Sequence, residues 1–159
     1  MYITTTFKND LKMVQYAYDT LKSLGPQLPA SPGSSITITI QPVTPATTSK
    51  GASSGGNSLG LDDSRTALVL CLVSASWDNP GHDTAVNKLA NQIKDRIVTE
   101  SKRRGLWNRW VYLNYADKSQ NPIEGYGTVN KLKLQAVSLK YDPLGFFQYR
   151  VPGGFKLFR

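Results

Sequence analysis

The chain has one cysteine and one histidine in 159 residues. A zinc or iron–sulfur site takes three or four ligands drawn mainly from these residue types, and a disulfide framework needs further cysteines. We therefore expect no metal site. Cys71 lies inside the apolar run Leu68–Val73, which is typical of an inert buried thiol rather than a nucleophile.

Long hydrophobic runs are also lacking. No window approaches the roughly 18 consecutive apolar residues of a membrane-spanning helix. The first residues, Met1–Thr6, have neither the basic flank nor the apolar stretch of a signal peptide. The sequence predicts no membrane partner, and it leaves the compartment open.

Acidic residues are scarce in the second half of the chain. Residues 81–159 carry 14 basic and six acidic side chains, which accounts for the whole net charge of +8. Such an excess can attract nucleic acid or an acidic protein surface, and it can also be a solvated face. We favour the solvated face, because no spacing typical of a nucleic-acid-binding motif is present.

Hydrophobic periodicity predicts most of the elements. The 3.6-residue period predicts helices over residues 7–24, 83–104 and 129–139, and the first of them places Phe7, Leu11 and Tyr18 on one stripe. Alternation predicts a half-buried strand over 36–41, and a continuous apolar run predicts a central strand over 66–77. The fold class expected is α+β, with a mostly antiparallel sheet covered by helices.

The ends of the 83–104 helix carry clear signals. Asp83 is the expected N-cap, and Gly105 is the expected left-handed terminator. The basic residues 102–104 suit the negative end of the helix dipole. Their charge thus has a local explanation that does not need nucleic acid.

Residues 107–115 are expected to form another strand. Side chains alternate across a strand, so Trp110, Tyr112 and Asn114 would share one face and Tyr115 would lie on the other. Because asparagine is disfavoured in strands, Asn114 should have a specific hydrogen-bonding partner, either structural or a ligand. In this geometry a core or cap role is favoured for Tyr115.

Residues 44–65 are expected to form a long loop rich in glycine and serine. A phosphate-binding cradle is disfavoured there, because Asp62 and Asp63 stand where a Walker loop needs lysine and serine or threonine. Asn57 is expected to form a turn, with a substrate contact as the alternative. Gln41 ends the isoleucine-rich strand, at a position that is either solvated or directed at a pocket.

Several separate motifs resemble the C-terminal part of the berberine bridge enzyme-like flavoproteins, above all their fungal members. They are Gly51–Ala52, Gly55–Asp63, Trp110–Asp117, Asn121–Gly127, Lys140–Pro143, Phe147–Gln148 and Val151–Leu157. They occur in the family's order and cover essentially the whole chain.

The resemblance implies a two-part organisation. Residues 1–106 would belong to the substrate-binding domain of a flavoprotein, and residues 107–159 would be the berberine-like segment that packs on an FAD domain. Enzymes of this family oxidise small organic substrates by hydride transfer to FAD, often in secondary metabolism. The family's FAD-binding domain has no counterpart in this sequence, so the chain is expected to be inactive alone.

The resemblance also assigns the site. Tyr112 would take a substrate proton, and Asn114 and Tyr115 would lie near the flavin. Gln41 and Asn57 are candidate substrate contacts. A free phenol titrates near pH ~10, so a base at Tyr112 needs a cation or a hydrogen bond that favours its anion.

Three other hypotheses stay open. The chain could be a catalytically inactive partner that docks on a separate FAD domain through its aromatic tail, or a homo-oligomer formed through the same surface. It could also be the product of a broken gene, which the sequence upstream in the genome would decide.

Overall fold

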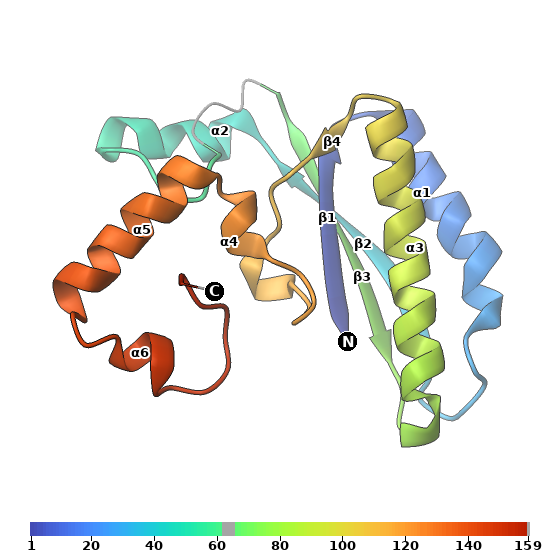
Figure 1. The fold of residues 1–159 in the computed structure, drawn as a ribbon. Coiled ribbons are helices and arrows are strands. Elements are labelled where there is room, and N and C mark those ends of the chain that lie inside the picture. Colours follow the sequence, from blue (N-terminus) through green and yellow to red (C-terminus); the bar gives the residue numbers. More distant parts are fainter. Residues whose placement is uncertain (62–65, 159) are drawn as a thin grey trace.

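A computed structural model describes residues 1–61 and 66–158, except for the side chains of residues 52–54. Figure 1 shows that most of the sheet and the helices packed beside it come from the first two thirds of the chain, and that the last third contains one long helix with short helices and turns. The elements are β1 (Tyr2–Lys8), α1 (Leu11–Leu24), η1 (Gly25–Gln27), β2 (Ser35–Val43), α2 (Pro45–Thr48), η2 (Ser49–Ser54), β3 (Leu68–Ser76), η3 (Pro80–His82), α3 (Asp83–Arg103), β4 (Trp107–Asn108), η4 (Leu113–Tyr115), α4 (Pro122–Gly125), α5 (Thr128–Tyr141) and α6 (Phe146–Tyr149).

The four strands form one antiparallel sheet in the order β2-β3-β1-β4. β3 lies between β2 and β1, and it is buried along nearly its whole length. A strand enclosed on both faces needs apolar residues at successive positions, which the run from Leu68 supplies. The predicted α+β class and the predicted central strand are confirmed.

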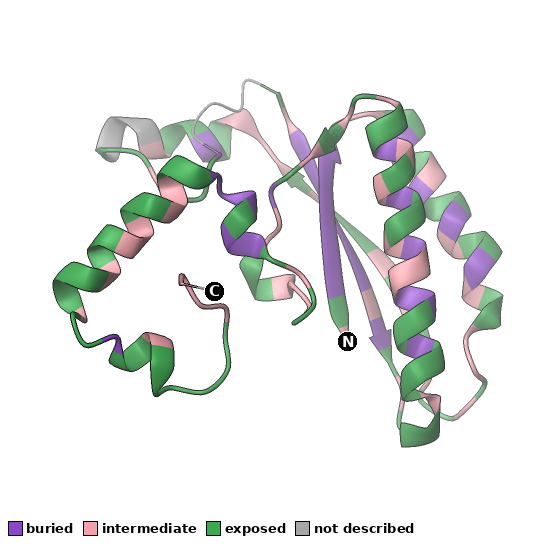
Figure 2. Ribbon diagram, in the orientation of Figure 1, coloured by how far each residue is buried: buried purple, intermediate pink, exposed green. Residues whose placement is uncertain are grey.

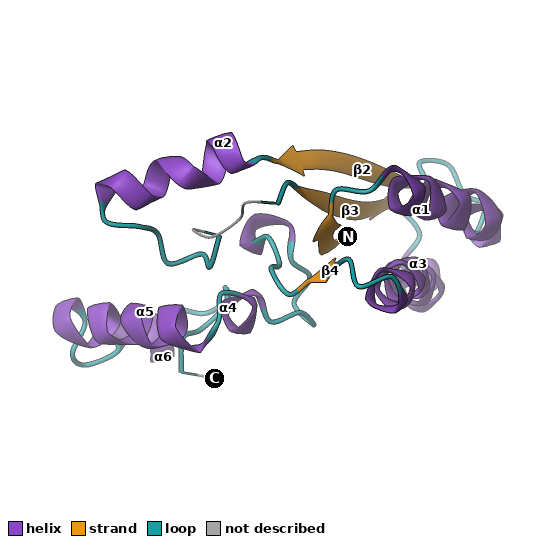
Figure 3. Cartoon of the chain, turned by 90° about the horizontal axis from the view of Figure 1, so that it is seen from above, coloured by secondary structure: helices purple, strands orange, loops and turns teal. Residues whose placement is uncertain are grey.

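The two faces of the sheet pack against different partners. Val69, Cys71 and Val73 lie in one core cluster with residues of α1 and α3, whereas Leu68 and Leu70 lie in a second cluster with Trp110 and other residues of the later chain. Figure 3 shows α1 and α3 grouped together, apart from α4 and α5. Burial raises the pKa of the Cys71 thiol to about 12, so the predicted inert cysteine is confirmed.

The predicted helix over 83–104 is confirmed, and its apolar stripe is buried (Val86, Leu89, Ala90, Ile93 and Ile97). The Asp83 N-cap is wrong: His82 is the N-cap residue, and the Asp83 carboxylate accepts a hydrogen bond of 2.6 Å from Trp77 Nε1. Gly105 ends the helix as expected, with φ at 67°. The Leu106 amide then donates to the Ser101 carbonyl, as in a Schellman ending.

Glu100 connects the basic residues at the end of α3. Both Arg103 and Arg104 donate to its carboxylate at 2.7 Å. These hydrogen bonds lower the pKa of Glu100 from 4.5 to about 2. Since the unfolded chain binds the proton more tightly, the interaction stabilises the fold above pH 4.5 and its contribution is lost as the pH falls towards 2.

We therefore expect Glu100→Gln to reduce the loss of stability between pH 4.5 and pH 2, the interval set by this pKa shift. Urea unfolding at several pH values across that interval measures the effect. The variant should show a flatter dependence of the midpoint on pH than the wild type. Equal slopes for the two proteins would contradict this assignment.

The first predicted helix begins later than expected. Residues 2–8 form β1, and Phe7 is fully buried from that strand rather than from a helix. The helix begins at Leu11, after Asp10 accepts the Met13 amide as its N-cap. Its buried face is Met13, Ala17, Thr20 and Leu24, while the predicted stripe residues Leu11 and Tyr18 are exposed. The predicted stripe is misplaced because it starts at Phe7, which belongs to β1.

The predicted strand over 107–115 is wrong beyond Asn108. The Asn108 side chain accepts the Trp110 amide at 2.9 Å, which turns the chain away from the sheet. Next to β4 on the edge of β1, a side chain replaces a strand: Gln120 donates to the Thr4 carbonyl at 2.7 Å and accepts the Thr4 amide at 3.0 Å. These two bonds satisfy backbone groups that the missing strand would have paired.

The later half is less buried than the first (Figure 2). α5 confirms a helix near residues 129–139, but it has no buried residue, and the predicted stripe residues Val129, Leu132 and Leu139 are all more than half exposed. The expected loop over 44–65 contains α2 and η2. Asp62 and Asp63, which were the reason for disfavouring a phosphate-binding cradle, lie outside the residues that the structure describes.

The tail folds back on α5. Gln135 donates to the Leu157 carbonyl at 2.7 Å, and Lys156 donates to the carbonyls of Phe147 and Val151. These contacts hold the tail against α5 and α6. Among the described residues, no helix is both long and apolar enough to cross a membrane. The division at residue 106 stays a prediction.

Candidate functional site

An open pocket of about 410 Å³ lies on the second face of the sheet. It is bounded by the end of β2, by α2, by the segment that follows η2, and by the segment that leads into η4. Its lining residues are Gln41, Pro42, Val43, Thr47, Thr48, Asn57, Leu59, Leu61, Leu70, Trp110, Tyr112 and Tyr115. Four of the five predicted site residues are therefore in one lining: Gln41, Asn57, Tyr112 and Tyr115.

Sheet register places Gln41 in this pocket. Gln41 pairs with Leu70, and its neighbour Ile40 pairs with Cys71 of the helix-covered core. Since side chains alternate along a strand, Gln41 and Leu70 share the opposite face, where Leu70 forms part of the floor. Gln41 thus lies at the open pocket with its side chain half-buried.

Three aromatic rings form one wall. The Trp110 and Tyr112 ring centroids are 5.7 Å apart with a tilt of 34°, and those of Tyr112 and Tyr115 are 5.0 Å apart and nearly perpendicular. Trp110 is 5% exposed and packs with Leu70 and Tyr126. Its Nε1 is buried and has no hydrogen-bond partner within residues 1–61 and 66–158.

Tyr112 and Asn114 meet, although the strand that was predicted to bring them together is absent. The η4 turn begins directly after Tyr112, and Asn114 Nδ2 donates to Tyr112 Oη at 2.8 Å. The Tyr112 oxygen is therefore the hydrogen-bonding partner that was expected for Asn114. It uses the Tyr112 oxygen as an acceptor, so the phenolic proton stays available for a second interaction. Asn114 itself is exposed and is not among the pocket-lining residues.

The orientation of Tyr115 differs from the sequence prediction. A regular strand would have placed Tyr115 opposite Tyr112, but the helical turn of η4 brings their rings into edge contact. Tyr115 also contacts Tyr2 at 5.8 Å between ring centroids. Its position beside Tyr112 therefore follows from the turn.

Asn57 has the turn role that the sequence favours, and it also lines the pocket. Its Oδ1 accepts the Leu59 amide at 2.8 Å, which fixes the backbone between two lining residues. The next glycine then approaches the later chain closely. A Cβ on Gly60 would lie 2.5 Å from the Tyr126 carbonyl oxygen, and its φ is 74°.

Tyr126 lies behind the aromatic wall, in the same cluster as Trp110. Burial raises the pKa of the Tyr126 phenol, and the charge of the Tyr112 phenol raises it further. Tyr126 is therefore a poor proton acceptor at neutral pH, and it serves as packing for the wall.

Sequence reasoning missed the contributions of Thr47, Thr48, Leu59 and Leu61. The two threonines lie on α2, a four-residue helix inside a segment expected to be a loop. The signal available was Pro45 at the first helical position, which is a common helix start. Leu59 and Leu61 are apolar, but they belong to no helical or strand period that would have predicted their position.

A second, larger open groove lies between α1 and α3 and has a volume of about 940 Å³. Its lining includes Lys88, Asp95, Arg96 and Glu100, and none of the predicted site residues. Glu100 is already engaged by Arg103 and Arg104. Within the described parts of the chain, no three His, Cys, Asp or Glu side chains gather as they would at a metal site.

The chain is similar in sequence to several fungal proteins. The chain is 38% identical over 120 residues to the FAD-dependent monooxygenase sdcF of Emericella nidulans, a match that covers 76% of this chain and 25% of sdcF. It is 32% identical over 160 residues to the FAD-dependent monooxygenase drtC of Aspergillus calidoustus, covering 99% of this chain and 30% of drtC. It is also 31% identical over 154 residues to the oligopeptidase PhomG' of Diaporthe leptostromiformis, covering 96% of this chain and 12% of that protein.

No family model and no solved structure matches the chain. The chain spans about a quarter to a third of the length of sdcF and drtC. The sequence is thus related, over most or nearly all of its length, to one segment of fungal proteins that are named FAD-dependent monooxygenases.

Proposed function

We propose that this chain is the substrate-side part of an FAD-linked oxidoreductase of the berberine bridge enzyme-like type. It would oxidise a small organic substrate of secondary metabolism. The observation that supports this most is the convergence of Gln41, Asn57, Tyr112 and Tyr115 on one pocket, with Asn114 hydrogen-bonded to Tyr112. The names of sdcF and drtC support the redox class and the flavin.

The pocket suits a ring system better than a complete FAD molecule. A diphosphate needs cations or a row of backbone amides at a helix N-terminus. Within the described lining there is neither a lysine nor an arginine. The aromatic wall can pack against a flat ring, so the chain offers contacts for the substrate and for the flavin ring, while the diphosphate must be held by another part of a longer protein.

In this proposal Tyr112 accepts the proton of a substrate hydroxyl. Bound FAD supplies an acceptor for the two electrons of the oxidation. Asn114 is a positioning residue: the hydrogen bond that it donates holds the Tyr112 oxygen in place. Tyr115 holds the other edge of the Tyr112 ring and is the second candidate for a contact with the flavin.

The purified chain alone is expected to carry no flavin. Since the described lining lacks groups for the diphosphate, FAD should leave the protein during desalting. Visible absorbance of the desalted chain, with and without added FAD, measures this. A stoichiometric flavin spectrum that survives desalting would contradict the proposed division of labour.

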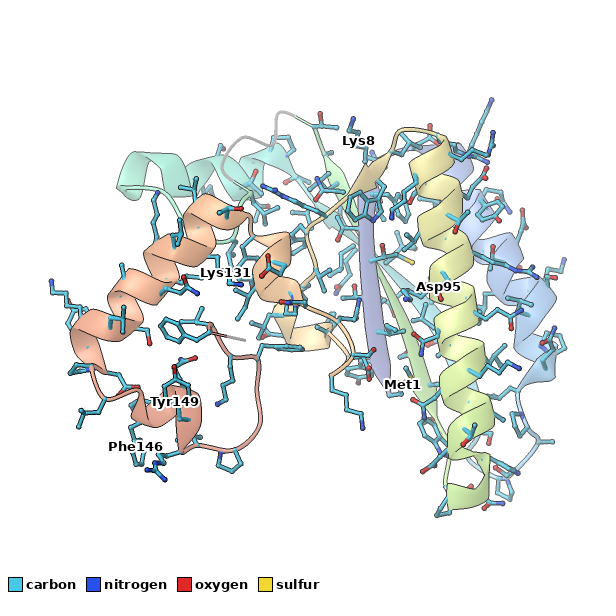
Figure 4. The ribbon with its side chains drawn as sticks, viewed as in Figure 1. Met1, Lys8, Asp95, Lys131, Phe146 and Tyr149 are labelled. Atoms are coloured by element: carbon cyan, nitrogen blue, oxygen red, sulfur yellow. The ribbon has the colours of Figure 1, made fainter. Side chains whose placement is uncertain are left out.

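The apolar surface of α5 and α6 supports a docking role within the same proposal. It consists of Val129, Leu132, Val137, Leu139, Tyr141, Leu144, Phe146, Phe147 and Tyr149, each more than half exposed. Figure 4 shows Phe146 and Tyr149 on α6, far from the sheet. Because the relatives are three to four times longer than the segment matched here, the partner proposed for this surface is the FAD-binding remainder of such a protein.

Without that partner, the exposed surface is expected to make the chain self-associate as its concentration rises. Sedimentation velocity over a concentration series measures this. Leu132→Glu should suppress the association, whereas Leu11→Glu, which changes an exposed leucine on α1, should not. A chain that stays monomeric at high concentration would count against this surface.

A further inference from the structure

The chemistry of the pocket lining is divided between its walls. One wall carries neutral amide and hydroxyl groups from Gln41, Thr47, Thr48 and Asn57. The other wall consists of aromatic rings, and the floor is aliphatic, with Leu61 and Leu70. Within the described lining no side chain is Asp, Glu, Lys, Arg or His.

This lining penalises a charged ligand. A carboxylate or an ammonium group that leaves water for the pocket would lose part of its hydration and meet no opposite charge among the described lining residues. A hydroxyl or carbonyl group of a neutral ligand would instead find the amide of Gln41 as a partner. The described lining therefore favours neutral ligands over charged ligands of the same shape.

The aromatic wall has a geometry that suits flat molecules. Tyr115 stands at 88° to Tyr112 and forms a corner with it, and the largely buried Trp110 packs against Tyr112 with a tilt of 34°. A planar ring can stack on one tyrosine of the corner and meet the edge of the other, an arrangement favoured by aromatic quadrupoles. The volume of about 410 Å³ lies at the low end of small-molecule sites, which run from about 300 to 1,000 Å³.

We propose that this pocket selects an uncharged, flat, hydroxylated ring compound, such as a bicyclic phenol, over organic acids and amines of the same shape. Its hydroxyl would lie on the Gln41 side and its rings on the Trp110–Tyr112 side. This inference rests on the proposed function for the reaction that follows binding, and it concerns binding to this chain without flavin.

Three probes with one ring system test the selection: 2-naphthol, 2-naphthoate and protonated 2-naphthylmethylamine. Isothermal titration of the full chain measures binding at pH 7. We expect 2-naphthol to bind at least ~10-fold more tightly than either charged probe, which corresponds to about 1.4 kcal/mol. Binding of a charged probe as tight as that of 2-naphthol, or binding of none of the three, would overturn the proposal.

A pair of variants on one strand locates the effect. Gln41→Glu places a carboxylate in the pocket and should shift the preference from 2-naphthol towards the ammonium probe by at least ~10-fold. Thr39→Glu adds the same charge two residues earlier on β2, at an exposed position outside the lining, and should leave the preference unchanged. Thermal melts confirm that both variants fold, and equal shifts in the two would place the probe site elsewhere and overturn the assignment.

The outcome separates this inference from the proposed function. Neutral selectivity in a chain that never supports flavin-dependent oxidation would retain the binding inference and remove the redox role. Flavin-dependent oxidation of an organic acid or an amine would retain the redox role and overturn the selectivity.

Discussion

Replacing Tyr112 by phenylalanine is expected to lower turnover by about 10²- to 10⁴-fold, the usual contribution of a positioned acid or base. The measurement uses a chimera in which this chain replaces the matching 30% of drtC. The substitution keeps the ring contacts with Trp110 and Tyr115 and removes the oxygen that Asn114 engages. The loss should fall mainly on kcat, because the ring contacts that shape the pocket stay in place.

Tyr115→Phe is the matched control for this prediction. It removes a phenolic oxygen from the ring that touches Tyr112 at 5.0 Å between centroids, and it should change kcat far less. Asn114→Ala should have an intermediate effect, because the phenol remains but loses its donor. Equal losses for Tyr112→Phe and Tyr115→Phe would show that the wall, and not the Tyr112 oxygen, carries the effect.

Gly60→Ala is expected to destabilise the chain by about 2–5 kcal/mol. Part of this loss, about 1–2 kcal/mol, comes from placing a side chain at a left-handed φ. The rest, about 1–3 kcal/mol, comes from overpacking, because the new Cβ would lie 2.5 Å from a backbone oxygen of Tyr126. Since Gly60 lies between the lining residues Leu59 and Leu61, the pocket should open as the contact is lost.

Gly55→Ala separates the cost of the left-handed backbone from the cost of overpacking. Gly55 also has a positive φ, 91°, but nothing lies within 4 Å of its added Cβ. Only the conformational cost of about 1–2 kcal/mol should therefore appear. Urea unfolding of both variants measures the difference, and equal destabilisation would show that the loop does not depend on its approach to Tyr126.

Local sequence patterns predicted α3 and β3, whose patterned apolar residues are buried. The five residues Val86, Leu89, Ala90, Ile93 and Ile97 repeat with the helical period, and the run from Leu68 to Val73 suits a strand enclosed on both faces. In both cases one periodic signal and the tertiary packing agree, so the pattern was sufficient.

The patterns failed where single side chains compete with backbone pairing. Asn108 turns the chain after two residues of β4, and Gln120 occupies the edge of β1 that a longer strand would have paired. Alternation alone reveals neither contact: the Asn108 bond is a local turn within the predicted strand, and the Gln120 bonds join residues 116 positions apart. Tyr112 and Asn114 still meet because the η4 turn, which begins directly after Tyr112, brings Asn114 Nδ2 to 2.8 Å from Tyr112 Oη.

The sequence predicted individual residues of the candidate site, but it did not predict that four of them line one pocket. Gln41 needed the register with Leu70, and Asn57 needed the position of the turn beside α2. The neutral polar wall depended on a helix of four residues that the glycine- and serine-rich composition concealed. The sequence thus identified four side chains that line the pocket, and the fold supplied their convergence.

The position of the flavin ring in a complex of this chain with the FAD-binding remainder of a relative decides whether Tyr112 and Asn114 face the cofactor. A crystal structure of the flavin-loaded complex or chimera provides it. We expect the isoalloxazine ring to lie at the mouth of the pocket, in contact with the Tyr112–Asn114 pair. A ring bound away from this pocket, with Tyr112 covered by packed protein instead, would contradict the proposed role of the pair.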